Sequence, residues 1–287
     1  MKTRVVLLTL LAMIAFASNS LLCRAALRDT TIDPASFTFV RIFSGAVALW
    51  LILNLRKSTS SREGNWISAL ALFVYAAAFS FAYVDLSAGT GALLLFGAVQ
   101  ATMILWGFRK GERLDAIQVA GLVVALIGLV VLVFPGISAP PLIGSGLMLS
   151  AGVAWGIYSL RGRSAAKAIA VTTGNFLRAV PFAALISVIM LPKMHFDSLG
   201  TIYAVISGAI TSGIGYVIWY AALSDLKAAS AATVQLSVPV LAATGGILLL
   251  SEPITLRYVI ASTAVLGGVA MVVIEKQRAS SGAENQK

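Results

Sequence analysis

The sequence predicts an all-α polytopic membrane protein, in which ten transmembrane helices form two inverted five-helix repeats. Its mean hydropathy is +0.94, 59% of its residues are hydrophobic and only 11% are charged. A chain of this composition cannot bury its apolar side chains in one water-soluble core. Two further observations support the same fold class: long apolar runs follow one another along the chain, and the second half repeats features of the first.

The apolar runs have the length of membrane-spanning helices, because about 20 helical residues cross a hydrocarbon core of roughly 30 Å. They lie at residues 5–22, 35–55, 66–84, 88–108, 114–134, 142–161, 170–191, 199–222, 228–250 and 254–274. The first run follows Lys2 and Arg4 as the apolar part of a signal peptide would, but its features recur in the sixth run. We therefore expect it to be the first helix.

Lysine and arginine residues predict the orientation of these spans. When the loops are assigned to alternate sides, 15 of the 21 basic residues fall on the side of the termini, 4 fall on the other side, and 2 lie inside spans. Cytoplasmic loops carry the excess of basic residues, so both termini are expected in the cytoplasm and the protein in a bacterial-type cytoplasmic (inner) membrane. The net charge of +10 is explained by this topology, and nucleic acid is not an expected partner.

The second half of the chain repeats polar landmarks of the first half. A shift of 140 residues places Asp85 on Asp225, Glu112 on Glu252 and Gly128 on Gly268, and slightly shorter shifts place Phe16 on Trp155 and Arg41 on Arg178. The predicted units are repeat 1 at residues 1–137, repeat 2 at 138–275 and a polar cytoplasmic tail at 276–287. Because each repeat has an odd number of spans, the second enters the membrane from the opposite side, as in many transporters.

Several motifs resemble the drug/metabolite transporter superfamily in its EamA-type branch. They are Phe16-Ala17-Ser18-Asn19, the arginine of the second span (Arg41), Ala88 to Ala92, Gly111-Glu112-Arg113-Leu114 and Ser251-Glu252-Pro253-Ile254. Within that superfamily the chain is most similar to YddG-type exporters of amino acids, including aromatic ones. The resemblance implies alternating access, with the fifth and tenth helices at the periphery and the others around the substrate path.

The inverted repeat predicts a transporter, and the resemblance implies that it exports small organic metabolites, with amino acids, aromatic ones included, as the leading substrate class. All 11 acidic residues lie in or beside the gaps between apolar runs, so we expect facilitative transport or exchange without a protonated carboxylate in the membrane. No cofactor and no metal are expected, and the partners are a small-molecule substrate and the lipid bilayer; the oligomeric state stays open. The alternatives are a broad-specificity drug/metabolite exporter or, in another class, an intramembrane enzyme or a scaffold.

Polar and aromatic side chains inside the spans are the candidates for substrate contact, because lipid offers polar groups no partner. The substrate-binding candidates are Asn19, Tyr75, Phe79, Tyr83, Gln100, Trp155, Tyr158, Tyr216 and Gln235. The alternative for each is a structural role, as an interhelical hydrogen bond or in helix packing.

The two arginines inside spans are expected to form structural ion pairs. Arg41 is predicted to pair with Asp85, and Arg178 with Asp225, because each acid lies in a loop on the side from which its arginine's helix enters. Glu112 and Glu252 are predicted to begin the fifth and tenth helices, where a carboxylate interacts favourably with the helix dipole.

Overall fold

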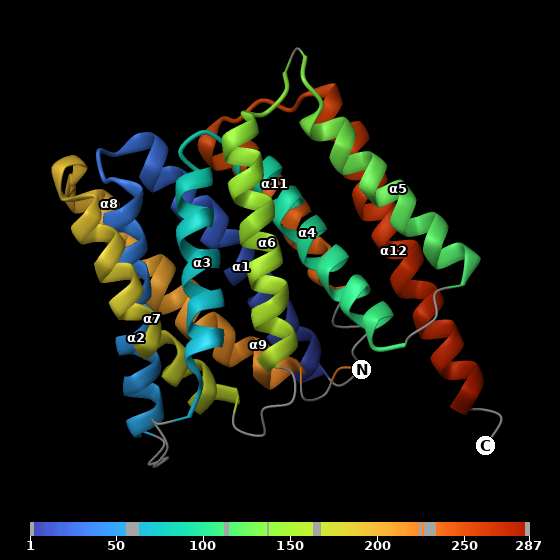
Figure 1. Ribbon diagram of the computed structural model, residues 1–287, viewed down its shortest axis with the longest axis horizontal. Coiled ribbons are helices and arrows are strands. Elements are labelled where there is room, and N and C mark those ends of the chain that lie inside the picture. The colour runs from blue at the N-terminus through green and yellow to red at the C-terminus, as the bar shows by residue number, and fades with distance from the viewer. Residues whose placement is uncertain are drawn as a thin grey trace.

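The computed structural model describes residues 3–55, 63–111, 115–136, 138–162, 168–223, 226 and 234–284, with the backbone alone for 276–284. Every regular element in this part of the chain is a helix (Figure 1). The α-helices are α1 (Thr3–Asp29), α2 (Pro34–Leu55), α3 (Trp66–Ala82), α4 (Ala88–Arg109), α5 (Ala116–Val133), α6 (Leu142–Gly162), α7 (Ala168–Ile189), α8 (Ser198–Val205), α9 (Gly215–Leu223), α11 (Ser237–Leu250) and α12 (Leu256–Glu284). A short 3₁₀ turn, η1 (Leu191–Lys193), and a π-helix, η2 (Ile206–Ile214), complete the set.

Eight helical segments are long and apolar enough to cross a membrane, and one of them is Ser198–Leu223, which α8, η2 and α9 form together. Two shorter apolar helices, α3 and α11, occupy the third and ninth predicted spans. α11 is short because the helix restarts at Ser237 after a turn at Leu236, and Pro239 in its first turn needs no N–H partner. The all-α membrane fold is therefore confirmed, whereas the number of ten spans remains a prediction.

Helix starts are determined by side chains that lie in the polar gaps of the sequence. Asn65 begins α3 by accepting from the Ser68 N–H, Ser87 begins α4, and Asp197 begins α8. Asp115 and Gln118 form a reciprocal capping box at the start of α5. These interactions span three residues of chain, so they locate the helix boundaries locally and leave the apolar stretch that follows free to pack.

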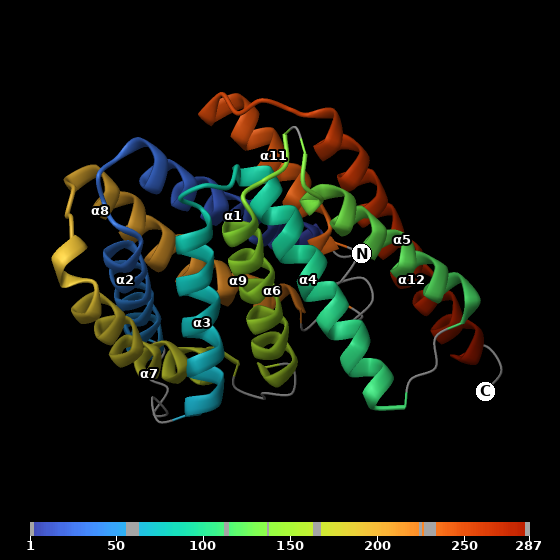
Figure 2. The same cartoon turned by 45° about the horizontal axis from the view of Figure 1, so that its top comes forward.

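The helix contacts have the symmetry expected of two repeats. α6 packs on α3 and α4, and its counterpart α1 packs on the η2–α9 segment and on α11. α2 contacts η2 as α7 contacts α3, and α2 also packs directly on α7. α5 and α12 pair with each other at one side of the bundle, as the resemblance implies, and this arrangement is visible from two directions in Figures 1 and 2. The repeat boundaries themselves remain a prediction.

Two glycines bring helices close together around the middle of the bundle. A Cβ at Gly152 in α6 would lie 2.5 Å from the carbonyl oxygen of Leu95 in α4, and a Cβ at Gly208 in η2 would overlap the carbonyl of Arg41 in α2. Since small residues allow backbones to approach, these contacts hold α6 against α4 and the π-helix against α2.

The chain ends mark one end of the bundle. The N- and C-termini lie at the lower end in Figure 1, which we call the terminal end. The loops at 30–33, 83–87 and 251–255 lie at the other end, which we call the Glu252 end. The described loops at the Glu252 end thus lie opposite the chain termini.

Candidate functional site

A small cavity lies where α1, α3, α4, α6, η2 and α9 meet, near the middle of the bundle. Its volume is about 20 Å³, little more than one water molecule needs. The lining residues are Phe16, Asn19, Ser20, Tyr75, Phe79, Leu95, Phe96, Trp155, Thr211, Ser212 and Tyr216. Six of these eleven are aromatic, so the walls can offer ring faces to an apolar or aromatic group.

Trp155 in α6 is at the centre of the aromatic walls. Its ring centroid lies 4.9 Å from that of Tyr75, 5.1 Å from that of Tyr216 and 5.5 Å from that of Tyr158. Phe16 of α1 closes the other side, 6.5 Å from Trp155 and 6.0 Å from Tyr216. Rings from four helices therefore meet at Trp155, and each such pair contributes about 0.5–1.5 kcal/mol beyond the area that it buries.

Neutral polar groups meet on one wall of the same cavity. The Asn19 side chain donates to the Tyr75 hydroxyl (3.4 Å) and accepts from Ser207 (2.6 Å) and Thr211 (3.3 Å). The π-helical turn η2 presents both of these hydroxyls to α1, a local geometry that recurs at functional sites. The Ser212 hydroxyl, also buried in the wall, has no hydrogen-bond partner among the described residues.

Arg41 does not form the predicted ion pair with Asp85. Its side chain is 2% exposed and donates from Nη2 to the Tyr75 hydroxyl at 3.1 Å. The guanidinium carbon lies 4.8 Å from the centre of the Phe79 ring and 5.2 Å from that of Tyr75. Asp85 is exposed in its loop, and Arg24 of α1 binds the neighbouring carbonyls of Tyr83 and Val84. The reason is that the Arg41 side chain turns inward toward α3, away from the loop.

Arg178, the repeat counterpart of Arg41, is only half-buried and lies near the terminal end. It donates to the carbonyl oxygens of Glu63 and Gly174, both at 2.9 Å. Asp225, its predicted partner, lies outside the described residues, so that pairing remains a prediction.

The remaining candidates are buried to different degrees, and none of them lines the cavity. Tyr83 is fully buried and donates to the Ala88 carbonyl, and Tyr158 packs behind Trp155. Gln100 is buried farther along α4, and Gln235 is half-buried just before α11. Tyr158 and Tyr83 support the walls through ring contacts with Trp155 and Phe79, while Asn19, Tyr75, Phe79, Trp155 and Tyr216 form them.

Several lining residues were not among the predicted site residues, and one of them had a usable signal in the sequence. Phe16 was aligned with Trp155 in the internal repeat, so its position facing the Trp155 ring could have been inferred from that match. Thr211 and Ser212 gave no such signal, because a π-helical turn shifts the faces that an α-helical period predicts.

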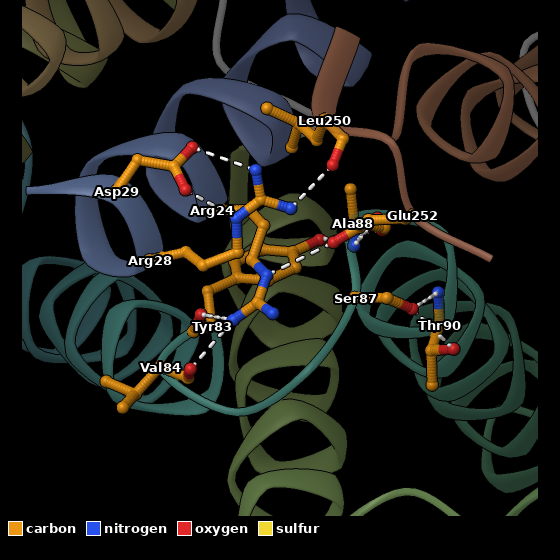
Figure 3. Close-up of polar contacts among 10 residues, drawn as sticks. All are labelled: Arg24, Arg28, Asp29, Tyr83, Val84, Ser87, Ala88, Thr90, Leu250 and Glu252. Atoms are coloured by element: carbon orange, nitrogen blue, oxygen red, sulfur yellow. Dashed lines mark hydrogen bonds and ion pairs between the residues drawn. The ribbon is translucent and has the colours of Figure 1, made fainter. Parts of the chain in front are cut away.

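Glu252 was predicted to begin its own helix, but its side chain instead links α1 to the start of α4 at the Glu252 end (Figure 3). α12 begins at Leu256, and the Thr255 hydroxyl accepts from the Tyr258 N–H in the first turn. Glu252 is 9% exposed; one carboxylate oxygen accepts from the Ala88 N–H at the start of α4, and the other lies 3.1 Å from Arg24 Nε. The protein thus contains a buried carboxylate that the sequence did not reveal, although it lies at a helix end. Glu112 lies outside the described residues.

A wider hollow of about 310 Å³ adjoins this cluster between α4, α11 and α12. It is larger than the central cavity, but it lies at the end of the bundle and Tyr258 is its one aromatic lining residue. We regard it as a vestibule, since the ring faces and convergent polar groups typical of a small-molecule site lie at the central cavity.

Comparison with known proteins supports the resemblance to EamA-type transporters over nearly the whole chain. The model of the EamA-like transporter family matches residues 3–134 and again 142–274. An uncharacterized protein of Pseudomonas aeruginosa is 56% identical over 271 residues, which is 94% of each chain. The uncharacterized transporter YoaV of Bacillus subtilis is 24% identical, covering 84% of this chain and 87% of its own. An uncharacterized transporter of Archaeoglobus fulgidus is 28% identical, covering 84% and 89%.

A solved crystal structure shares the fold, with a TM-score of 0.69 and 19% identity over 96% of this chain and 98% of its own. The first family match covers α1 to α5, and the second covers α6 to residue 274 of α12. The chain belongs to the EamA-like transporter family.

Proposed function

We propose that this membrane transporter exports amino acids, aromatic ones included, from the cytoplasm by alternating access at the central cavity. The observation that carries the proposal is the wall of six aromatic rings next to the Asn19, Thr211 and Ser212 side chains. Ring faces suit an apolar or aromatic side chain, and neutral polar groups suit the charged ends of a zwitterion. The charge distribution supports cytoplasmic termini in an inner membrane, and on that basis the Glu252 end faces outward.

The geometry also supports a closed resting conformation. A cavity of about 20 Å³ cannot hold an amino acid, so the rings around Trp155 must move apart when substrate enters. We propose that the substrate's own gradient, or exchange of one substrate for another, drives this cycle. The buried carboxylate at Glu252 is held by Arg24 and the Ala88 N–H at the bundle end, away from the central cavity.

The proposal is tested by counterflow in liposomes that contain only the purified protein, with no pH gradient or membrane potential. Labelled phenylalanine and tryptophan should accumulate against unlabelled amino acid inside. Trp155→Ala should reduce this counterflow about tenfold or more. The variant lacks the ring that contacts Tyr75, Tyr158 and Tyr216, and such aromatic pairs contribute about 0.5–1.5 kcal/mol each. The matched control is Trp50→Ala, since Trp50 is 44% exposed on the lipid-facing side of α2 and should leave counterflow unchanged.

Absence of exchange with any amino acid would contradict the proposal. A broad-specificity exporter would instead accumulate bulky apolar compounds that amino acids fail to displace. Strict dependence on an imposed pH gradient would contradict the facilitative mechanism and direct attention to Glu252.

A further inference from the structure

Arg41 carries a positive charge in the protein interior without a carboxylate partner in the described chain. Its side chain is 2% exposed, and the groups that face it are Tyr75, Phe79, Tyr216 and Cys23. An arginine keeps its charge at all accessible pH values, and a buried charge is costly unless it is paired. The π-faces of Tyr75 and Phe79 and the Tyr75 hydroxyl compensate only part of that cost.

The guanidinium also has an unused donor. Nη2 binds the Tyr75 hydroxyl, but Nη1 is buried without a hydrogen-bond partner among the described residues. Buried donors normally find partners, and guanidinium groups are shaped to bind a carboxylate through two parallel hydrogen bonds. The missing partner therefore has the chemistry of a carboxylate, or of another planar anion.

The position of Arg41 places this unused donor next to the wall of the substrate cavity. Tyr75 and Phe79, on which the guanidinium rests, both form the cavity wall, and the Tyr75 hydroxyl is the point where Arg41 and Asn19 meet. Because the rings must separate before any substrate fits, movement of Tyr75 would expose both terminal nitrogens of Arg41 to the enlarged cavity.

We propose that Arg41 binds the carboxylate of the transported molecule, and that the Tyr75 hydroxyl occupies this position in the empty protein. The inference rests on the proposed function for the location of the substrate, and it adds a requirement that the proposed function lacks. The substrate must carry a carboxylate, whereas its amino group is not required. Arg41 thereby selects amino acids and related aromatic acids against neutral or purely cationic aromatic compounds.

The experiment compares three ligands of one shape with the full-length purified protein. L-phenylalanine has both charged groups, 3-phenylpropionate has only the carboxylate, and L-phenylalaninamide has only the amine. Dissociation constants are measured by tryptophan fluorescence and by thermal stabilisation. We expect both carboxylates to bind at least about tenfold more tightly than the amide, since hydrogen bonds to charged groups contribute roughly 1.5–3 kcal/mol and 1.4 kcal/mol is tenfold.

Variants of Arg41 then assign this preference to its guanidinium. In Arg41→Gln the preference should disappear, because 3-phenylpropionate and L-phenylalanine should bind more weakly while the dissociation constant of the amide stays within about twofold of the wild-type value. Arg41→Lys should retain part of the preference. Arg178→Gln is the matched control, because Arg178 is the repeat counterpart, donates to backbone carbonyls and lies away from the cavity. It should keep the full preference.

Tyr75→Phe provides an independent test if Arg41→Gln does not fold. Loss of the competing hydroxyl should tighten carboxylate binding several-fold and leave amide binding unchanged. Equal affinity of the wild-type protein for the three ligands, binding of none of them, or an unchanged preference in both variants would overturn the inference.

The same ligands separate this inference from the proposed function. Arg41-dependent binding of 3-phenylpropionate without phenylalanine transport would refute the amino-acid assignment alone. Equal transport of phenylalanine and its amide would refute the role of Arg41 alone.

Discussion

The two ends of the bundle are held together by arginines, but with different partners. At the Glu252 end, Arg24 of α1 forms a buried ion pair with Glu252 and also binds two carbonyls of the α3–α4 loop, while Arg28 binds the Leu250 carbonyl (Figure 3). At the terminal end, Arg161 of α6 binds Asn65 Oδ1 and Ser68 Oγ, and Arg178 of α7 binds the carbonyls of Glu63 and Gly174.

The contacts of Arg24 and Arg161 predict that separating these two arginines from their partners has a different cost at each end. Separation of Arg24 from Glu252 leaves two opposite charges without their partner in a partly dry environment, whereas water can replace the neutral acceptors of Arg161. A carrier that alternates access needs both ends to open, so unequal closure would bias its resting state. Here the bias favours a closed Glu252 end.

The largest expected effect comes from breaking the ion pair. Glu252→Gln should lower the free energy of unfolding by about 3 kcal/mol, because Arg24 loses its counter-charge where its side chain is 14% exposed. The same change should speed the reaction of Cys23 with a membrane-impermeant maleimide by at least about tenfold, since this sole cysteine is fully buried in α1 next to Arg24.

Asp29→Asn is the control for this experiment. It removes the more exposed pair between Arg28 and Asp29, which should contribute at most about 1 kcal/mol. Equal protection of Cys23 in wild type and Glu252→Gln would show that the ion pair does not close this end.

A smaller effect is expected at the terminal end. Asn65→Ala removes the cap of α3 and one acceptor of Arg161, and should lower stability by about 1 kcal/mol, the usual cost of a lost N-cap. The same variant should leave Cys23 labelling from the Glu252 end unchanged, which separates the two ends in one assay. A loss as large as that of Glu252→Gln would contradict the proposed asymmetry.

The smallest effect concerns Asp33, which secures α2 at the Glu252 end. Its carboxylate accepts from the Ala35, Ser36 and His195 N–H groups at 2.9–3.0 Å. Partial burial raises the pKa of Asp33, but the hydrogen bonds to Ser36, His195 and Ala35 outweigh burial and lower it below its ordinary value. A lowered pKa means that this contribution to stability is complete above the unfolded value of about 3.9 and is lost as pH falls through the folded value.

The contribution of Asp33 to stability should therefore change only at acidic pH. The melting temperature of the wild-type protein should exceed that of Asp33→Asn by a constant amount between pH 7 and pH 5, and the difference should shrink below about pH 4. A difference that grows on acidification would show that the sign of the pKa shift is wrong.

Much of this architecture could be predicted without coordinates. Hydropathy located most helices to within a few residues, because apolar length and polar gaps are local properties of the chain. The exceptions are α1 and α12, which continue to Asp29 and Glu284, and α11, which starts only at Ser237. Asp115 and Asp197 lie in such gaps and become helix caps through contacts only three residues away. The aromatic stripe of Tyr75 and Phe79 was also visible from its four-residue spacing.

Long-range partners could not be predicted in the same way. Asp85 and Glu252 are both acids beside apolar runs, yet one is exposed and the other is buried against Arg24 and α4. The prediction for Arg41 failed for the same reason, since the distance from the helix start indicates depth but not the direction in which the side chain points.

The sequence by itself therefore determined the membrane-spanning all-α class, the approximate helices and the internal duplication, since these depend on composition and period. Only the tertiary structure decided that Arg41 rests on the cavity wall, that Glu252 links α1 to α4, and which rings meet at Trp155. The physical reason is that apolar helices can pack in many rotations and registers, and hydropathy does not distinguish between these arrangements. Steric contacts at Gly152 and Gly208, together with the π-helical turn η2, select one of them.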